Sequence, residues 1–210
     1  QATSIDSSLL SERRRYSVRL PASYARSPQR RYPVIYVLDA PSQDAHTAAS
    51  AALMARIGVT PEAIVVGIHN LDGESRQRDF TPPGMRQDAD GDDGRTGRAD
   101  RFHAFIRDEL LPEIDQRYRT SSFRILAGWS RAGLFVVYSL TQDPGLFGAY
   151  VANSPALWRD DAEMVRRLDR FLRANPPAKA SLFLSLGSAE NDKMKRGFLH
   201  AVAVLRERHD

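Results

Sequence analysis

The chain has 210 residues, a length that suits one well-buried domain. It is 42% apolar and 27% charged, a composition typical of a globular protein. It contains no cysteine, which excludes disulfides, thiolate catalysis and zinc sites built on cysteine. The net charge of +4 comes from 30 basic and 26 acidic residues spread along the chain, and no basic block is interleaved with aromatic residues. Nucleic acid is therefore not an expected partner. No apolar run is long enough to span a bilayer.

Short apolar runs alternate with amphipathic segments, which predicts a mostly parallel sheet with helices on both faces. The predicted strands are, in chain order, Tyr16–Leu20, Pro33–Leu38, Ala63–Ile68, Phe123–Ala127, Gly148–Ala152 and Ser181–Leu186. The predicted helices are His46–Ile57, Phe102–Tyr118 with a bend at Pro112, Leu134–Leu140, Asp161–Leu172 and Met194–Arg206. No repeat or linker interrupts this alternation, so we expect residues 1–210 to form a single α/β domain.

One acidic segment, Asp88–Gly94, invites comparison with the start of an EF-hand loop. Such a loop needs glycine at its sixth position and glutamate at its twelfth, and this chain has Asp93 and Ala99 there. We therefore expect a solvated loop that leads into the next helix, and no metal site.

The most informative motif is Gly128-Trp-Ser-Arg-Ala-Gly133, because a predicted strand precedes it and a predicted helix follows it. Strand, G-x-S-x-small and helix form the layout of a nucleophile elbow, in which a sharp turn exposes a serine above a sheet. Gly128 and Ala132 are small enough for the strand and the helix to approach closely. Ser130 would then lie at a helix N-terminus, where backbone N–H groups favour negative charge. The alternative is an ordinary serine in a glycine-containing turn.

Segments along nearly the whole chain resemble, in order, the putative-esterase group of α/β hydrolases. This group includes the enterochelin (siderophore) esterases, the esterase D-like enzymes and the mycolyltransferases. The matching segments are Tyr32–Asp39, Val66–Asn70, Arg78–Pro82, Ala127–Gly133, Asn153–Trp158 and Leu184–Glu190. The resemblance implies an α/β-hydrolase fold that needs no cofactor.

The resemblance implies that Ser130 attacks an ester carbonyl and forms an acyl-enzyme. A histidine should accept the proton of the serine, and a carboxylate should orient that histidine. Glu190 matches the position of the acid, with Asp192 as the second choice. The alternative for Glu190 is an acidic residue that is favoured at a helix N-terminus by the helix dipole.

The histidine departs from the family pattern, which places it on a loop after the final strand. After Ser130 the chain has only His200, within a predicted helix, and His209, the penultimate residue. His69, after a strand end, matches a position that the family uses for binding or structure. We therefore expect the last strand and its histidine loop to lie beyond residue 210, so that the domain is C-terminally incomplete.

The oxyanion hole also departs from the pattern. One donor should be the N–H of Arg131, the residue after the nucleophile. The family draws the other from one or two residues after Asp39, and here these are Ala40 and Pro41. Proline has no N–H, so Ala40 or Ser42 would have to donate. A missing donor costs about 3 kcal/mol of transition-state stabilisation.

Four further residues are candidates for substrate binding. Arg78 and Asp79 match a family element beside the active-site cleft, where they would contact substrate or form an internal ion pair. Trp129 and Trp158 would wall an acyl or aryl pocket, or belong to the core.

The sequence thus predicts a serine carboxylic-ester hydrolase, with a small-molecule ester as its partner. An acyltransferase of the same fold is one alternative. A non-catalytic binding module is another, favoured by Pro41 and by the missing histidine. Siderophore, feruloyl, acetyl-sugar and short acyl esters all remain open as substrates. The lack of cysteine and a start at Gln1 favour a periplasmic or secreted protein, with the cytoplasm as the alternative.

Overall fold

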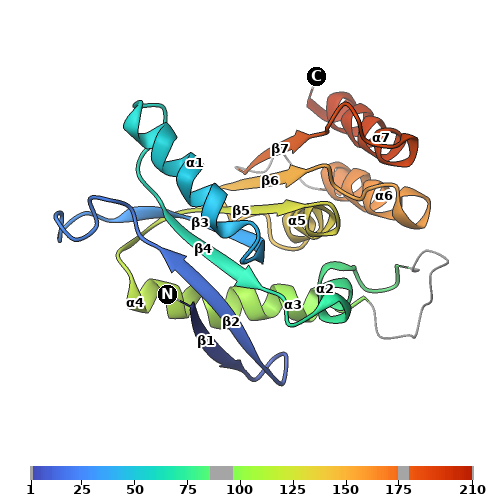
Figure 1. Cartoon of the computed structure of the whole chain (residues 1–210). Coiled ribbons are helices and arrows are strands. Elements are labelled where there is room, and N and C mark those ends of the chain that lie inside the picture. The colour runs from blue at the N-terminus through green and yellow to red at the C-terminus, as the bar shows by residue number, and fades with distance from the viewer. Residues whose placement is uncertain (1, 86–96, 175–179, 210) are drawn as a thin grey trace.

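The computed structural model describes residues 2–85, 97–174 and 180–209, so Asp88–Gly94 lies outside the described residues. They form one seven-stranded sheet in the order β1-β2-β4-β3-β5-β6-β7 (Figure 1). β2 pairs antiparallel with β1 and β4, and all other neighbours are parallel. The strands are β1 (Ala2–Ser7), β2 (Glu12–Arg19), β3 (Tyr32–Ala40), β4 (Ile64–His69), β5 (Thr120–Trp129), β6 (Ala149–Asn153) and β7 (Ser181–Ser185).

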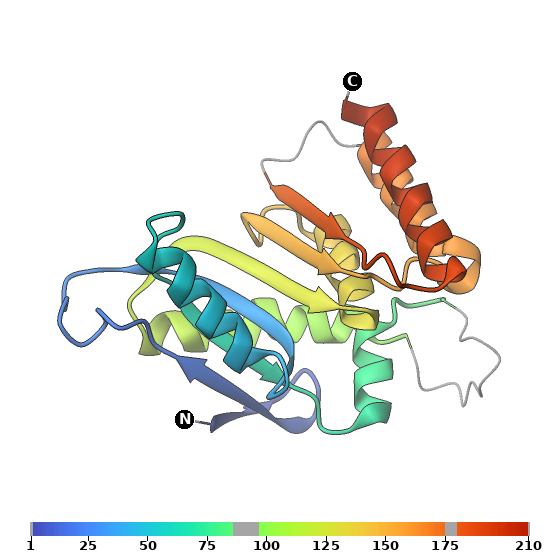
Figure 2. The ribbon, with the colours of Figure 1, turned by 45° about the horizontal axis from the view of Figure 1, so that its top comes forward.

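Helices lie on both faces of the sheet, as the sequence predicts. Figure 2 shows α1 on one face and α3, α4 and α5 on the other. α6 packs against α5, and α7 packs against α6. The helices are α1 (Asp44–Arg56), α2 (Gly73–Phe80), α3 (Ala99–Phe105), the π-helix η1 (Ile106–Leu110), α4 (Leu111–Arg117), α5 (Arg131–Gln142), α6 (Arg159–Ala174) and α7 (Asp192–His209). Within the described residues, no helix is long and apolar enough to cross a membrane.

The six predicted strands are confirmed as β2 to β7, with bounds that differ by a few residues. β4 is buried along its whole length, as expected for a central parallel strand. An aromatic cluster lies between the sheet and the helices of the α5 face. In it the ring of Phe102 lies 5.5 Å from that of Phe80 and 5.2 Å from that of Phe135. All three side chains are fully buried.

Four features differ from the prediction. β1 and α2 were not expected, because β1 has little apolar alternation and α2 is short and polar. Where a bend was expected at Pro112, the structure has the π-helix η1, which ends two residues before the proline. Proline has no N–H to donate to the normal helical hydrogen bond. α6 begins irregularly, because residues 160–162 have positive φ angles of 49°, 52° and 62°.

The topology brings several functional candidates to one edge of the sheet. β3, β4 and β5 are parallel, so their carboxyl ends lie together, and Ala40 at the end of β3 pairs with His69 at the end of β4. Trp129 at the end of β5 pairs with Asn153 at the end of β6. α1, α2 and α5 begin just beyond these ends. In open α/β sheets this is the edge where ligands bind.

The acid stability of α6 should depend on Glu163. Burial alone would raise the pKa of its carboxyl, but hydrogen bonds from Arg167, Arg166 and Arg170 outweigh burial and lower the pKa to about 2. A lowered folded-state pKa adds stability above the unfolded pKa of 4.5, which is lost as the pH falls towards 2. Glu163→Gln should therefore flatten the decline of unfolding free energy over this range, measured by urea denaturation.

Glu207→Gln, at an exposed glutamate of α7, is the matched control and should keep the wild-type pH profile. An equal flattening in both variants would contradict the assignment to Glu163.

Candidate active site

Ser130 lies on a strained turn between β5 and α5. Its φ of 56° and ψ of −117° are unusual for a residue with a side chain, and the residue is exposed. Three backbone hydrogen bonds hold the turn. The N–H of Ser130 donates to the carbonyl of Asn153 at 3.0 Å, and its own carbonyl accepts from the N–H groups of Leu134 and Ala156 at 3.0 and 2.9 Å. This is the geometry of a nucleophile elbow.

Small residues allow the elbow to close. A Cβ added at Gly128 would come within 2.7 Å of the backbone of Ala132, so only glycine fits there. Ala132 occupies the position where the G-x-S-x-G motif has glycine. Its methyl group is fully buried there, so the packing accommodates it. A Cβ added at Gly133 would lie 3.0 Å from Pro155, which shows how closely α5 approaches the chain after β6.

Ser130 opens onto a pocket of about 730 Å³ at the carboxyl edge of the sheet. The loop after β3 and the first turns of α1 and α2 line the rest of it. The lining residues are Asp39, Ala40, Pro41, Ser42, Gln43, His46, Asn70, Asp72, Gly73, Arg76, Trp129 and Ser130. α1, α2 and α5 all start at this pocket, and helix N-termini favour negative charge.

The two expected oxyanion donors come from different elements, the start of α5 and the end of β3. Arg131 is the first residue of α5, and its guanidinium is anchored away from the elbow by a 2.8 Å hydrogen bond to Thr81 Oγ1. Ala40 and Pro41, joined by a cis peptide bond, both line the pocket at the end of β3. Pro41 has no N–H, so the backbone of Ala40 or Ser42 is left as the donor after β3.

An apolar groove of about 870 Å³ adjoins the pocket and shares Gln43, His46 and Trp129 with it. It runs along the face of the sheet that carries α1. Trp129 is 46% exposed, and Phe123 and Phe183 are exposed in the same groove. Trp129 therefore belongs both to the Ser130 pocket and to the apolar groove beside it.

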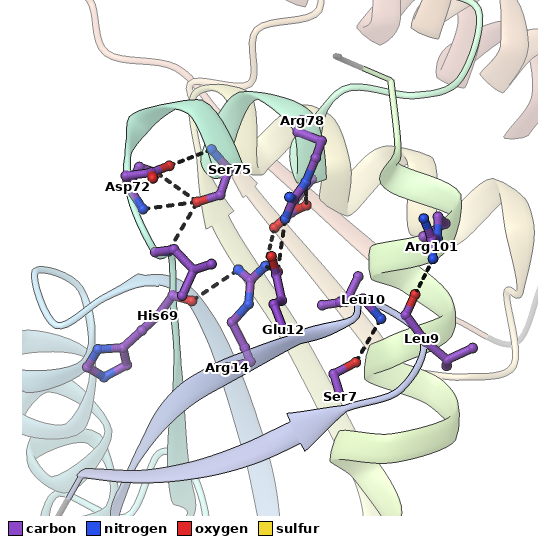
Figure 3. Close-up of polar contacts among 12 residues, drawn as sticks. Ser7, Leu9, Leu10, Glu12, Arg14, His69, Asp72, Ser75, Arg78 and Arg101 are labelled. Atoms are coloured by element: carbon purple, nitrogen blue, oxygen red, sulfur yellow. Dashed lines mark hydrogen bonds and ion pairs between the residues drawn. The ribbon is translucent and has the colours of Figure 1, made fainter.

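Arg78 and Asp79 belong to an internal charge network with Glu12 and Arg14. Figure 3 shows Arg78, Glu12 and Arg14 converging there. Arg14 and Asp79 have fully buried side chains, and Arg14 Nη2 donates to Asp79 Oδ2 at 2.7 Å. Arg78 Nε donates to the other oxygen, Asp79 Oδ1, at 2.8 Å, and Glu12 accepts from both arginines. Arg14 Nη1 also donates to the carbonyl of His69 at 3.3 Å.

The sequence left substrate contact and an internal ion pair as alternatives for Arg78 and Asp79. The structure shows the ion pair. The carboxylate of Asp79 is fully buried and both its oxygens are taken, so it does not reach substrate. Arg78 is partly exposed, but two carboxylates hold its guanidinium. Sequence reasoning missed Arg14, although two-residue alternation places it on the same strand face as buried Tyr16.

Among the described histidines, His46 is the one that lines the Ser130 pocket, where it is exposed on the first turn of α1. His69 and His103 are buried, and burial lowers the pKa of each imidazole. His200 is exposed on α7, and His209 ends that helix. Neither His69 nor His103, both buried, is among the described residues that line the Ser130 pocket, so the geometry does not place either as the base.

Glu190, Asp192 and Trp158 are not among the described residues that line the pocket. Glu190 is half-buried in a turn after β7, where its N–H donates to the carbonyl of Gly187 at 3.1 Å. Asp192 is the first residue of α7. The indole N–H of Trp158 donates to Met194 Sδ at 3.0 Å, which ties Trp158 to α7.

A strained serine between strand and helix, at the carboxyl edge of a mostly parallel sheet, defines an α/β hydrolase. The chain belongs to the putative esterase family, whose model matches residues 7–208. This confirms the resemblance seen in the sequence.

Individual relatives agree with this assignment. The chain is 31% identical over 203 residues to the ferri-bacillibactin esterase BesA of Bacillus subtilis, covering 88% of this chain and 69% of that protein. It is 32% identical over 127 residues to the siderophore enterobactin esterase of Emericella nidulans, covering 55% and 42%. These relatives indicate that the chain is a carboxylic-ester hydrolase.

Solved structures show the same fold. The BES protein from Bacillus cereus matches with a TM-score of 0.84 and 25% identity, over 99% of this chain and 82% of that one. An IroE-like serine hydrolase from Shewanella oneidensis matches with a TM-score of 0.77 and 27% identity, over 99% and 79%.

Asp79→Ala should destabilise the protein by about 3–5 kcal/mol, because it removes the fully buried one of the two carboxylates that pair with the fully buried Arg14. Urea denaturation measures the change. The matched control is Asp6→Ala, whose exposed carboxylate pairs with exposed Arg13 and should contribute less than about 1 kcal/mol. Similar costs for the two variants would show that the buried network does not hold this part of the fold.

Proposed function

We propose that the protein hydrolyses carboxylic esters through an acyl-enzyme on Ser130. The observation that carries this proposal is the exposed, left-handed Ser130 at the start of α5, which opens onto a pocket. An ordinary turn serine does not need such strain, whereas a nucleophile presented above a sheet does.

In this mechanism Ser130 Oγ attacks the ester carbonyl, and the carbonyl oxygen gains negative charge. The N–H of Arg131 and a backbone N–H of Ala40 or Ser42 stabilise that charge, helped by the N-termini of α5 and α1. The alcohol leaves with a proton, and water then attacks the acyl-enzyme to release the acid and regenerate the serine hydroxyl.

A histidine must take the proton of Ser130. The family resemblance assigns this role to a loop after the last strand, with Glu190 as the orienting acid. Within the described residues, His46 is the imidazole at the pocket. His46→Ala tests this residue: loss of Ser130 reactivity would support His46 as the base, and unchanged reactivity would exclude it from that role.

A fluorophosphonate probe should label wild-type protein at Ser130, since only an activated serine reacts quickly. Peptide mapping by mass spectrometry locates the label. Ser130→Ala should abolish labelling. Ser50→Ala, which removes an exposed serine of α1, should keep it. An unlabelled wild-type protein, or a label on another serine, would contradict the proposal and favour a binding module.

We further propose a siderophore ester as the substrate class. Support comes from the relatives, which are named as esterases of ferri-bacillibactin, enterobactin and triacetylfusarinine C. The wide pocket also suits a bulky ester. The kcat/KM for enterobactin should exceed the kcat/KM for methyl ferulate by at least about tenfold, because an enzyme discriminates between substrates by binding their transition states differently. The reverse order would overturn the substrate class.

Acyl transfer is the competing reaction of the same intermediate. Adding a sugar or lipid alcohol to the assay tests it, because water and alcohol would compete for the acyl-enzyme. A hydrolase should release free acid with little ester exchange. Predominant formation of a new ester would instead assign the chain as an acyltransferase.

A further inference from the structure

The chain has an unusual backbone conformation where β3 enters the pocket. Asp39 has a φ of 61°, in the left-handed region that residues with a Cβ rarely adopt. The next residue is Ala40, which lines the pocket with Ser130. The conformation at residue 39 therefore sets the direction in which the Ala40 backbone enters the pocket.

Two side chains hold the carboxylate of Asp39. Arg76 grips it with both ends of its guanidinium, Nε donating to Oδ1 at 2.6 Å and Nη2 to Oδ2 at 2.8 Å. Asn70 Nδ2 donates to Oδ1 at 2.6 Å. The side chain of Asp39 is only 13% exposed and that of Arg76 30%. Such a bidentate pair fixes orientation as well as distance.

The residues that hold Asp39 are themselves fixed. Arg76 belongs to α2, whose start is closed by a reciprocal capping box between Asp72 and Ser75. Its guanidinium also lies 5.5 Å from the ring centre of Phe80, which is fully buried. Asn70 directly follows β4. Side chains from two separate elements, α2 and the end of β4, thus converge on one carboxylate of β3 at the edge of the pocket.

We propose that Arg76 and Asn70 are positioning residues that act through Asp39. They hold residue 39 in its left-handed conformation and so aim the backbone of Ala40 at the oxyanion that forms on Ser130 attack. This inference rests on the proposed function. It gives Arg76 a role other than direct contact with substrate, because the carboxylate of Asp39 occupies its guanidinium.

Glycine at position 39 gives a direct test, since glycine adopts a positive φ without strain and needs no clamp. Arg76→Ala should lower the labelling rate of Ser130 and kcat about tenfold with KM nearly constant, because oxyanion stabilisation is lost while substrate binding is kept. In the Asp39→Gly background the same Arg76→Ala change should alter the labelling rate and kcat by less than about twofold.

Arg76→Lys should restore little of the labelling rate or of kcat, since lysine cannot donate to both carboxylate oxygens in the bidentate geometry of arginine.

Arg124→Ala is the matched control. Arg124 is also partly buried, at 24% exposure, and pairs with Asp115. It should change neither rate. A rise in KM with constant kcat in Arg76→Ala would overturn the proposal and indicate substrate contact. So would an Arg76→Ala effect that is equally large with glycine at position 39.

Amide hydrogen exchange separates this inference from the proposed function. Exchange of the segment 38–43 should be faster in Arg76→Ala than in wild type, and unchanged in Arg124→Ala. Wild-type exchange rates in Arg76→Ala would overturn the proposal. If wild-type Ser130 stays unlabelled by the probe, the proposed function fails, whereas the exchange result still decides whether Arg76 holds the loop.

Discussion

The site depends on the backbone of Ser130, which stays in a conformation that costs about 1–3 kcal/mol. Hydrogen bonds to the N–H and the carbonyl of Ser130 offset this cost. The N–H of Ser130 donates to the carbonyl of Asn153 on the neighbouring strand. The pairing of β5 with β6 is thus part of the machinery that presents the serine. Gly128 completes it, because any larger residue would push α5 off the strand.

The charged residues around this elbow serve mainly to hold the backbone. Asp79 satisfies a buried arginine, and Asp39 engages a second arginine at the mouth of the pocket. The first pair joins β2 to α2, and the second joins α2 to the residue before Ala40. Arg131 extends the same pattern, since its side chain reaches Thr81, just after α2. A preorganised site of this kind does not reorganise its dipoles during the reaction.

The sequence predicts the central sheet well and these contacts poorly, for identifiable reasons. β3 and β4 are apolar and largely buried over several residues, which leaves a local signature, and β5 has an apolar run directly before the elbow motif. α2 leaves none, because its stability comes from a cap and tertiary contacts. The elbow was found because strand, motif and helix adjoin in the chain. The contact between Asp39 and Arg76 joins residues 37 positions apart, and no local pattern reveals it.

The two tryptophans of the chain differ in their surroundings, so their intrinsic fluorescence can report on the site. Trp158 is hydrogen-bonded to a thioether and has Arg159 and Lys193 over its ring, at 5.1 and 5.4 Å. Trp129 directly precedes the serine, and nearly half of its surface is open to solvent. A group placed on Ser130 would exclude water from the indole of Trp129 while the surroundings of Trp158 stay constant. Intrinsic fluorescence would therefore follow occupancy of the pocket without an added dye.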